Sequence, residues 1–330
     1  MKKLAQIAAA VAALGTISAA NAGVAIQFDP TGNGGSTGGT LSVETFDWAP
    51  DNALSVGAFS TTPNADGSVT TTTVAQARLT GFINSSAGED CATNIFYCAA
   101  AYTNEFTFQA SFRERSTGIG SSNANFTLDT SVGSFYRIFA NTPKDASNTT
   151  GGGYGNGTLI YEARITAVTG TFNDATRSDP GTNPVDLLDK NGVDNQNGVQ
   201  SHQGTGNNTI SMTVTFLNPA YFLSAITSAD DTTSLRTSFN QVNPSDTVVG
   251  FTPSYSFDGT DKINGDVGAG TCNPFAPNGR TESGDTNTGR CDFHIQTDGS
   301  LSFNLAPEPA TLGMLGLGLA FAGLSRRRSK

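Results

Sequence analysis

The residue types that perform catalysis are scarce in this chain of 330 residues. One histidine, His202, lies in a polar loop, and the other, His294, alternates with apolar residues as an outward strand position does. Ser-His-Asp and Cys-His mechanisms need a histidine base, and neither histidine lies in a recognisable motif. A glycosidase needs only two suitably spaced carboxylates, so a secreted glycoside hydrolase stays as a minor alternative. We expect no catalytic residues and a protein that is not an enzyme.

The cysteines are four in number, and in an exported chain an even number predicts disulfides. We favour the two local pairings, Cys91 with Cys98 and Cys272 with Cys291, because they close short loops. Zinc ligation is the weaker alternative, since the sequence contains no C-x-x-C pair and only two histidines could add nitrogen ligands.

An acidic, glycine-containing segment at residues 186–198 offers oxygen ligands of the kind that bind Ca2+. Its candidate metal ligands are Asp186, Asp189, Asn191 and Asp194. The EF-hand pattern is not met, and Asx and Gly residues make ordinary turns, which is the favoured interpretation. A looser cluster of the same kind follows at residues 258–266. Calcium is therefore the only cofactor that the sequence suggests, and otherwise none is expected.

Both ends of the chain predict targeting segments. Lys2 and Lys3 precede an apolar stretch that ends in Ala20-Asn21-Ala22, so a signal peptide is expected at residues 1–22, with Ala20 and Ala22 at its cleavage site. Near the other end, the apolar run from Thr311 to Leu324 is shorter than the roughly 20 residues that cross a bilayer. The basic cluster after it favours the cytoplasmic side, which places the preceding domain outside the inner membrane.

The C-terminal segment begins with Pro307-Glu308-Pro309, continues as a short Gly/Leu-rich apolar run and ends with Arg326, Arg327 and Arg328. This arrangement resembles the PEP-CTERM sorting signal of Gram-negative bacteria that make exopolysaccharide. The resemblance implies recognition by a membrane-embedded exosortase, transient insertion in the inner membrane and cleavage near the tripeptide. Release or attachment at the outer surface or in the extracellular matrix would follow. The expected organisation is a signal peptide at 1–22, an exported β-rich domain at 23–306 and a sorting signal at 307–330, with a plain single-pass anchor as the alternative.

The exported domain is more acidic than the whole chain, whose formal charge is -10. Both terminal segments together hold six of the 18 basic residues and one of the 28 acidic ones, which leaves 12 basic and 27 acidic residues, or -15. Binding to nucleic acid needs basic surfaces that neutralise phosphates, so this charge argues against nucleic acid as a partner. The same negative charge favours the binding of divalent cations.

Alternating apolar residues predict half-buried strands along most of the domain. In three segments the alternating face is clear: Phe106, Phe108, Ala110 and Phe112; Leu159, Tyr161, Ala163, Ile165 and Ala167; and Ile210, Met212, Val214 and Phe216. Weaker strand candidates are residues 40–46, 69–83, 125–128, 135–139 and 248–257. The expected fold class is all-β, a β-sandwich or jelly-roll-like body with long polar loops, plus a cleaved N-terminal signal helix and a short C-terminal hydrophobic helix.

Two finer predictions concern local structure. Residues 221–228 are the only candidate for a helix in the body of the chain. Residues 293–305 are expected to form a hairpin, with Phe293 and Ile295 on one strand and Leu301, Phe303 and Leu305 on the other. These two sets of side chains face the same core only if the connecting loop has an odd number of residues. A three-residue loop at Asp298–Ser300 meets this condition.

Two short motifs lie near the start of the exported domain. Residues 28–32 read Phe-Asp-Pro-Thr-Gly, and residues 45–54 contain Phe-Asp-Trp with Asp47 and Trp48, the only tryptophan. Their order resembles the PepA family of flocculation-associated PEP-CTERM proteins. The resemblance implies a surface or matrix protein that helps cells to aggregate in an exopolysaccharide floc. Trp48 could offer a platform on which a sugar stacks, but a buried anchor is the favoured interpretation.

The sequence thus favours an exported, non-enzymatic cell-surface or extracellular-matrix protein that promotes flocculation or biofilm formation. Its expected partners are an exosortase, exopolysaccharide or other matrix components, and copies of itself. The alternative function is that of a lectin-like carbohydrate-binding module, for which both calcium-dependent and calcium-independent binding stay open.

Overall fold

The computed structural model describes residues 25–35, 39–56, 64–118, 123–147, 152–174, 186–187, 200–201, 204–224, 232–239, 254–256, 262–264 and 293–304. These residues form an almost entirely β structure. The helical elements among them are two three-residue 3-10 turns, η1 (Ile95–Tyr97) and η2 (Ala99–Ala101). In this part of the chain we find no helix with the length and apolar character needed to cross a bilayer.

A nine-stranded antiparallel sheet makes up the body of the molecule. Its order is β11-β13-β16-β3-β4-β5-β6-β8-β7, and two further pairings, β11 with β8 and β5 with β7, close the sheet on itself. Strands β6 and β7 pair with successive parts of β5 and of β8, so together they occupy one position in the closed sheet. The bounds are β3 (Thr45–Val56), β4 (Val69–Ile83), β5 (Glu105–Thr117), β6 (Asn123–Leu128), β7 (Phe135–Asn141), β8 (Thr158–Asp174), β11 (Gly204–Leu217), β13 (Thr232–Phe239) and β16 (Phe293–Asn304).

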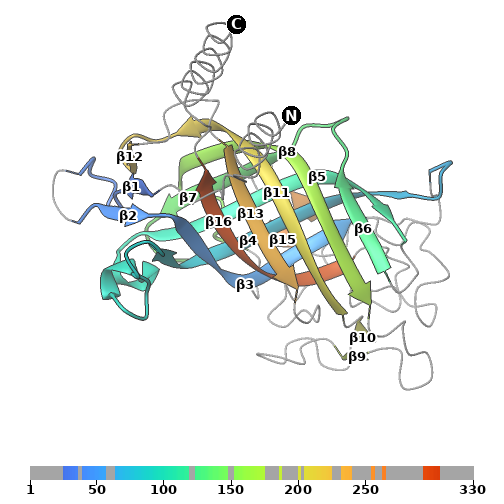
Figure 1. Ribbon diagram of the computed structural model, residues 1–330, viewed down its shortest axis with the longest axis horizontal. Coiled ribbons are helices and arrows are strands. Elements are labelled where there is room, and N and C mark those ends of the chain that lie inside the picture. Colours follow the sequence, from blue (N-terminus) through green and yellow to red (C-terminus); the bar gives the residue numbers. More distant parts are fainter. Residues whose placement is uncertain are drawn as a thin grey trace, which may run out of the picture.

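The closed sheet is flattened into two layers. Strands β16, β13, β11 and β8 form one layer, and β3, β4 and β5 cross behind them (Figure 1). The predicted all-β, sandwich-like body is confirmed. Neighbouring strands mostly follow one another along the chain, so the order is that of a meander rather than of the Greek keys of a jelly roll. The two predicted terminal helices, at residues 1–22 and 307–330, lie outside the described residues.

A small three-stranded sheet covers one end of the sandwich. It has the order β12-β1-β2 and consists of β1 (Ile26–Phe28), β2 (Leu41–Val43) and β12 (Phe222–Ser224). Phe28 and Phe222 from this sheet join the same buried cluster as Phe46 and Phe303 from the main sheet. We call this the capped end of the sandwich. Two short pairs complete the described strands: β9 (Asp186–Leu187) with β10 (Gln200–Ser201), and β14 (Ser254–Ser256) with β15 (Lys262–Asn264).

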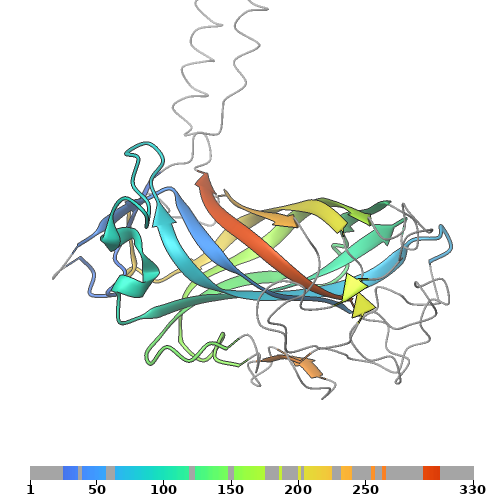
Figure 2. The ribbon, with the colours of Figure 1, turned by 90° about the horizontal axis from the view of Figure 1, so that it is seen from below.

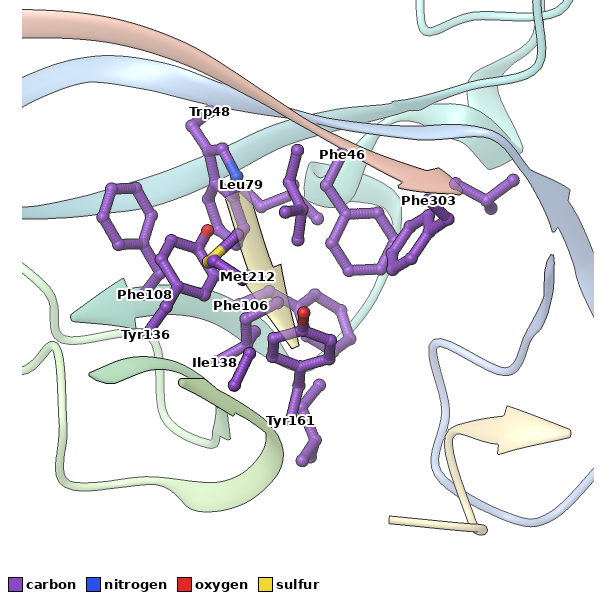
Figure 3. Packing of buried hydrophobic residues seen from close by; sticks show 14 of the residues in the cluster. Phe46, Trp48, Leu79, Phe106, Phe108, Tyr136, Ile138, Tyr161, Met212 and Phe303 are labelled. Carbon is purple, nitrogen blue, oxygen red and sulfur yellow. The ribbon is translucent and has the colours of Figure 1, made fainter. Parts of the chain in front are cut away.

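Aromatic side chains dominate the space between the layers. Phe46, Trp48, Phe108, Tyr136 and Tyr161 converge there with Met212 from β11 (Figure 3). Ring centroids lie 4.9 Å apart between Trp48 and Phe108 and again between Phe108 and Tyr136. Such contacts add to the gain from burying the rings, so this aromatic cluster holds the two layers together.

Strand alternation was predicted correctly where strands are regular. Strand β4 has the predicted bounds, and the predicted inward face of β5 lies in the core. In β8 and β11, bulges make the buried positions differ from those that the alternation predicts. Thr166 is an extra residue on β8, so Ala167 is exposed and Val168 points inward instead. Near the end of β11 a second irregularity leaves Phe216 43% exposed, although the pattern had placed it in the core.

Two local predictions are wrong. Residues 222–224 of the predicted helix form β12, because they pair with β1. Residues 293–304 form the single strand β16 instead of a hairpin, with β3 on one side and β13 on the other. Phe293, Ile295, Leu301 and Phe303 share one parity in a continuous strand as well as in a hairpin with an odd loop, so the alternation did not distinguish the two.

Candidate functional site

The Phe-Asp-Trp segment forms a bulge in β3. Between Trp48 and Ala53, β3 has one residue more than β4 opposite, and the pairing with β16 shifts by one residue in the same region. Before the bulge the buried residues are the even-numbered Phe46 and Trp48, and after it they are the odd-numbered Asp51 and Ala53. The extra residue thus shifts the alternation by one position, and both halves of β3 still direct side chains into the core. Pro50, which has no N–H to donate to a sheet ladder, is exposed in this irregular stretch.

Asp47 fixes a second irregularity on the neighbouring strand. Thr80 is an extra residue on β4, and its hydroxyl donates to the Asp47 carbonyl at 2.7 Å and to its carboxylate at 2.9 Å. The Trp48 indole, by contrast, is only 1% exposed. Burial agrees with the interpretation of Trp48 as a core anchor and leaves no surface on which a sugar ring could stack. The Phe-Asp-Trp motif therefore builds the fold.

Asp51 carries a buried carboxylate that meets the loop before β8. The Tyr154 hydroxyl donates to it at 2.7 Å, and the Tyr154 carbonyl accepts a hydrogen bond of 2.7 Å from Thr107 on β5. Burial and the adjacent Asp51 raise the pKa of Tyr154 far above its ordinary value, so the phenol stays a neutral donor. This pair ties the loop at residues 152–157 to β3.

The Phe-Asp-Pro segment is also explained by local structure. The Asp29 carboxylate accepts hydrogen bonds from the backbone of Thr31 at 2.8 Å, of Asn33 at 3.2 Å and of Gly35 at 2.7 Å. The Thr31 hydroxyl donates to it as well. Burial opposes ionisation of Asp29, but these donors outweigh it and lower its pKa below the usual value. Gly32 has φ of 72°, and a Cβ there would come within 2.5 Å of the Tyr221 ring, so glycine is required.

A polar group of side chains fills the interior at the end opposite the capped one. Glu114 has the same parity as Phe112 on β5 and is 4% exposed. Its carboxylate accepts a hydrogen bond of 2.6 Å from the Thr73 hydroxyl and is also hydrogen-bonded to Asn208. Burial raises the pKa of Glu114 to about 7, against the effect of both hydrogen bonds. Gly170 makes room for Asn208, since a Cβ there would lie 3.1 Å from the amide carbon.

This interior group, which we call the Glu114 cluster, retains hydrogen-bonding capacity. Within the described chain, one Glu114 oxygen and the hydroxyls of Thr71 and Ser116 have no partner. Strand alternation alone could have located Glu114, because it continues the inward series that begins at Phe106. The cluster can take up or release a proton near neutral pH.

A disulfide-closed loop projects between β4 and β5. Cys91 and Cys98 are bonded, which confirms that local pairing. Asn94 caps η1 by accepting a hydrogen bond of 3.1 Å from the backbone of Phe96. Tyr97 is buried beneath the loop, whereas Ile95 and Phe96 at its tip are 69% and 63% exposed. We call these two side chains the apolar tip; no periodic pattern or motif in the sequence marks them.

Hydrogen bonds through Glu44 connect this loop to β16. The Phe303 backbone donates to the Glu44 carbonyl at 3.3 Å, and the Glu44 carboxylate accepts from Ser85 at 3.0 Å and from Ser86. Ser85 and Ser86 begin the segment that contains the disulfide. The end of β16 therefore lies at the capped end, on the same side of the sandwich as the disulfide loop, as Figure 2 also shows.

Several predicted residues lie outside the described part of the chain. They include the signal cleavage residues Ala20 and Ala22, the pair Cys272 and Cys291, and the sorting residues Pro307, Glu308, Pro309, Arg326, Arg327 and Arg328. Of the candidate calcium ligands, Asp186 lies in β9, while Asp189, Asn191 and Asp194 also fall outside. Among the described residues, no group of three or more His, Cys, Asp or Glu side chains could hold a metal ion.

Comparison with known proteins gives one match. No curated protein and no solved structure matches the chain. Residues 305–328 match the PEP-CTERM protein-sorting motif, which begins directly after the last residue of β16. The chain therefore carries the signal that an exosortase recognises, and it is an exported protein on a sorting route associated with the cell envelope.

Proposed function

We propose that the mature domain is a non-enzymatic protein of the outer cell surface or extracellular matrix, which promotes flocculation or biofilm formation together with exopolysaccharide. The observation that carries this proposal is the sorting motif at residues 305–328, attached without a linker to a closed β-sandwich. The motif supports transient insertion in the inner membrane, after which the domain is released or attached outside.

The construction of the sandwich supports a structural role. Both motifs near the start of the domain serve the fold, through Asp29 in its loop and Asp47 at the bulge. The body would then contribute to the matrix as a stable unit with polar loops that can hydrogen-bond polysaccharide hydroxyl groups. Adhesion to exopolysaccharide, or between copies of the chain, is the activity that we assign to it.

Substitution of the tripeptide tests the sorting step in a Gram-negative host that has an exosortase. Replacing Pro307, Glu308 and Pro309 with alanine should abolish surface retention and cell aggregation together. The matched control replaces Ser325 and Ser329 in the same segment with alanine and should leave both unchanged. Aggregation at the normal level with the tripeptide variant would contradict the proposal.

A second experiment separates the adhesive role from the other two classes of function. Purified protein is mixed with native exopolysaccharide and, separately, with oligosaccharides prepared from it, with and without Ca2+. Binding to the polymer alone supports a matrix role. Saturable binding to the oligosaccharides would instead favour the lectin-like alternative, and release of reducing ends would favour the glycoside hydrolase.

A further inference from the structure

The apolar tip of the disulfide loop is unusual in being both exposed and rigidly held. Ile95 and Phe96 are adjacent, and both remain more than half exposed. Single exposed apolar residues are ordinary, but a bulky pair at the tip of a projection is typical of a contact surface. Nothing in the described part of the chain covers this pair.

The loop beneath the tip prevents the two side chains from folding back. The Cys91–Cys98 disulfide closes it, and the Tyr102 hydroxyl donates to the Phe96 carbonyl at 2.6 Å. Buried Tyr97 anchors it to the small sheet, since its hydroxyl donates to the Ser42 carbonyl at 3.1 Å. The tip is therefore presented in a fixed position.

The position of the disulfide loop relative to the sorting motif indicates which surface the apolar tip contacts. Glu44 bonds both to Phe303, near the end of β16, and to Ser85 at the start of the loop segment. The sorting motif begins at residue 305 and contains the apolar run from Thr311 to Leu324. Because β16 ends at the capped end, where the loop segment also begins, entry of that run into the bilayer would bring this end toward the membrane, together with the loop that carries the tip.

Charges on the loop decide which interaction is available. Residues 84–102 contain two acidic residues, Glu89 and Asp90, and no lysine, arginine or histidine. Asp90 is held by donors from Thr93 and Ala92 within the loop. Anionic lipid headgroups attract basic segments, so this loop gains nothing from them, and contact must come from the apolar side chains.

We propose that the apolar tip inserts into the boundary between headgroups and acyl chains of the bilayer while the sorting motif holds the chain there. The contact orients the domain with its capped end toward the membrane during sorting. This inference rests on the membrane-insertion step of the proposed function and adds a second point of attachment, formed by the folded domain itself.

The test places an indole at the tip of the full chain. The F96W protein is reconstituted into phosphatidylcholine vesicles whose acyl chains carry bromine, which quenches nearby indoles. The introduced indole should lose roughly half of its emission, as expected for a ring held about 5 to 10 Å below the headgroup surface. The matched control is V132W, because Val132 is exposed in the loop between β6 and β7, away from the capped end. Its added emission should be unaffected, and Trp48 serves as the buried reference in both proteins.

Flotation of the vesicles distinguishes the possible failures. If the F96W chain floats with the vesicles but its indole is unquenched, the proposed contact is wrong while membrane insertion of the sorting motif stands. If the chain does not float, the insertion step fails, and the proposed contact fails with it. Quenching that requires phosphatidylserine would overturn the apolar mechanism. A dimer in detergent that I95S/F96S converts to monomer would identify a second copy, rather than lipid, as the occupant.

Discussion

Glu114 gives the sharpest quantitative prediction. Its pKa rises from 4.5 in an unfolded chain to about 7 in the folded one, chiefly because burial disfavours the charged form. Between these two values the folded state binds more protons than the unfolded state, so the free energy of unfolding falls as the pH rises. Stability associated with the protonated carboxyl is fully present below pH 4.5 and is lost as the pH passes through about 7.

The magnitude follows from the size of the shift. Each pKa unit corresponds to about 1.4 kcal/mol, so the full effect amounts to roughly 3 kcal/mol. Glu114→Gln keeps an oxygen that can accept from Thr73 and removes the charge. The unfolding free energy of the variant minus that of the natural chain should therefore increase by roughly 3 kcal/mol as the pH rises from about 4 to about 8.

Urea unfolding of the full chain at a series of pH values, followed by the fluorescence of Trp48, measures this difference. Glu162→Gln is a matched control, because Glu162 pairs with Arg137 at 2.8 Å and is only half buried. It should leave the steep part of the profile in place. Thr73→Val, which removes one donor to Glu114, should move the steep part to higher pH. A Glu114→Gln profile parallel to that of the natural chain would refute the reasoning.

Three further outcomes are expected. Replacing Cys91 and Cys98 with serine should lower the free energy of unfolding by about 2 kcal/mol, since the pair closes a short loop with a sequence separation of 7; equal denaturation midpoints would contradict this. Trp48 should emit at short wavelength and resist quenching by acrylamide, and oligosaccharide should leave its emission unchanged, because the indole is 1% exposed. Asp29→Ala should destabilise the fold by about 2 kcal/mol at neutral pH, because several backbone donors lose their acceptor. Since ionised Asp29 stabilises the fold and its pKa is lowered, the difference from the natural chain should shrink as the pH falls through that lowered pKa, as acid unfolding experiments can show.

Regular strands could be predicted from the sequence because their signal is local. In β5 the alternation from Phe106 to Phe112 continues without interruption, and the structure places those residues in the core. A bulge changes the face of every later residue, and its position depends on the partner strand. Ala167 and Phe216 were misplaced for that reason, since the extra residues near them are defined only by the pairing of β8 with β11.

Parts of the site that join residues from distant strands could not be predicted from the sequence. The Cys91–Cys98 bond followed from its short spacing, and the sorting motif from its composition. The partners of Glu114, Thr73 and Asn208, come from β4 and β11, and no local pattern announces that they meet. The exposure of Phe96 likewise depends on how the loop is mounted on the sheet, while the same residue type is buried along β5.

The pairing of β16 with β3 has a consequence for export. Strand β3 is near the beginning of the domain and β16 is the last strand that the structure describes, yet Ser302 lies opposite Thr45. With the signal peptide that the sequence predicts, the N-terminus would cross first, so β3 would reach the outside long before β16 and the seam between them would stay open until β16 had crossed. Pairing over such a sequence separation is slow. The seam between β3 and β16 can therefore close only about when the sorting motif, which directly follows β16, reaches the membrane, or later.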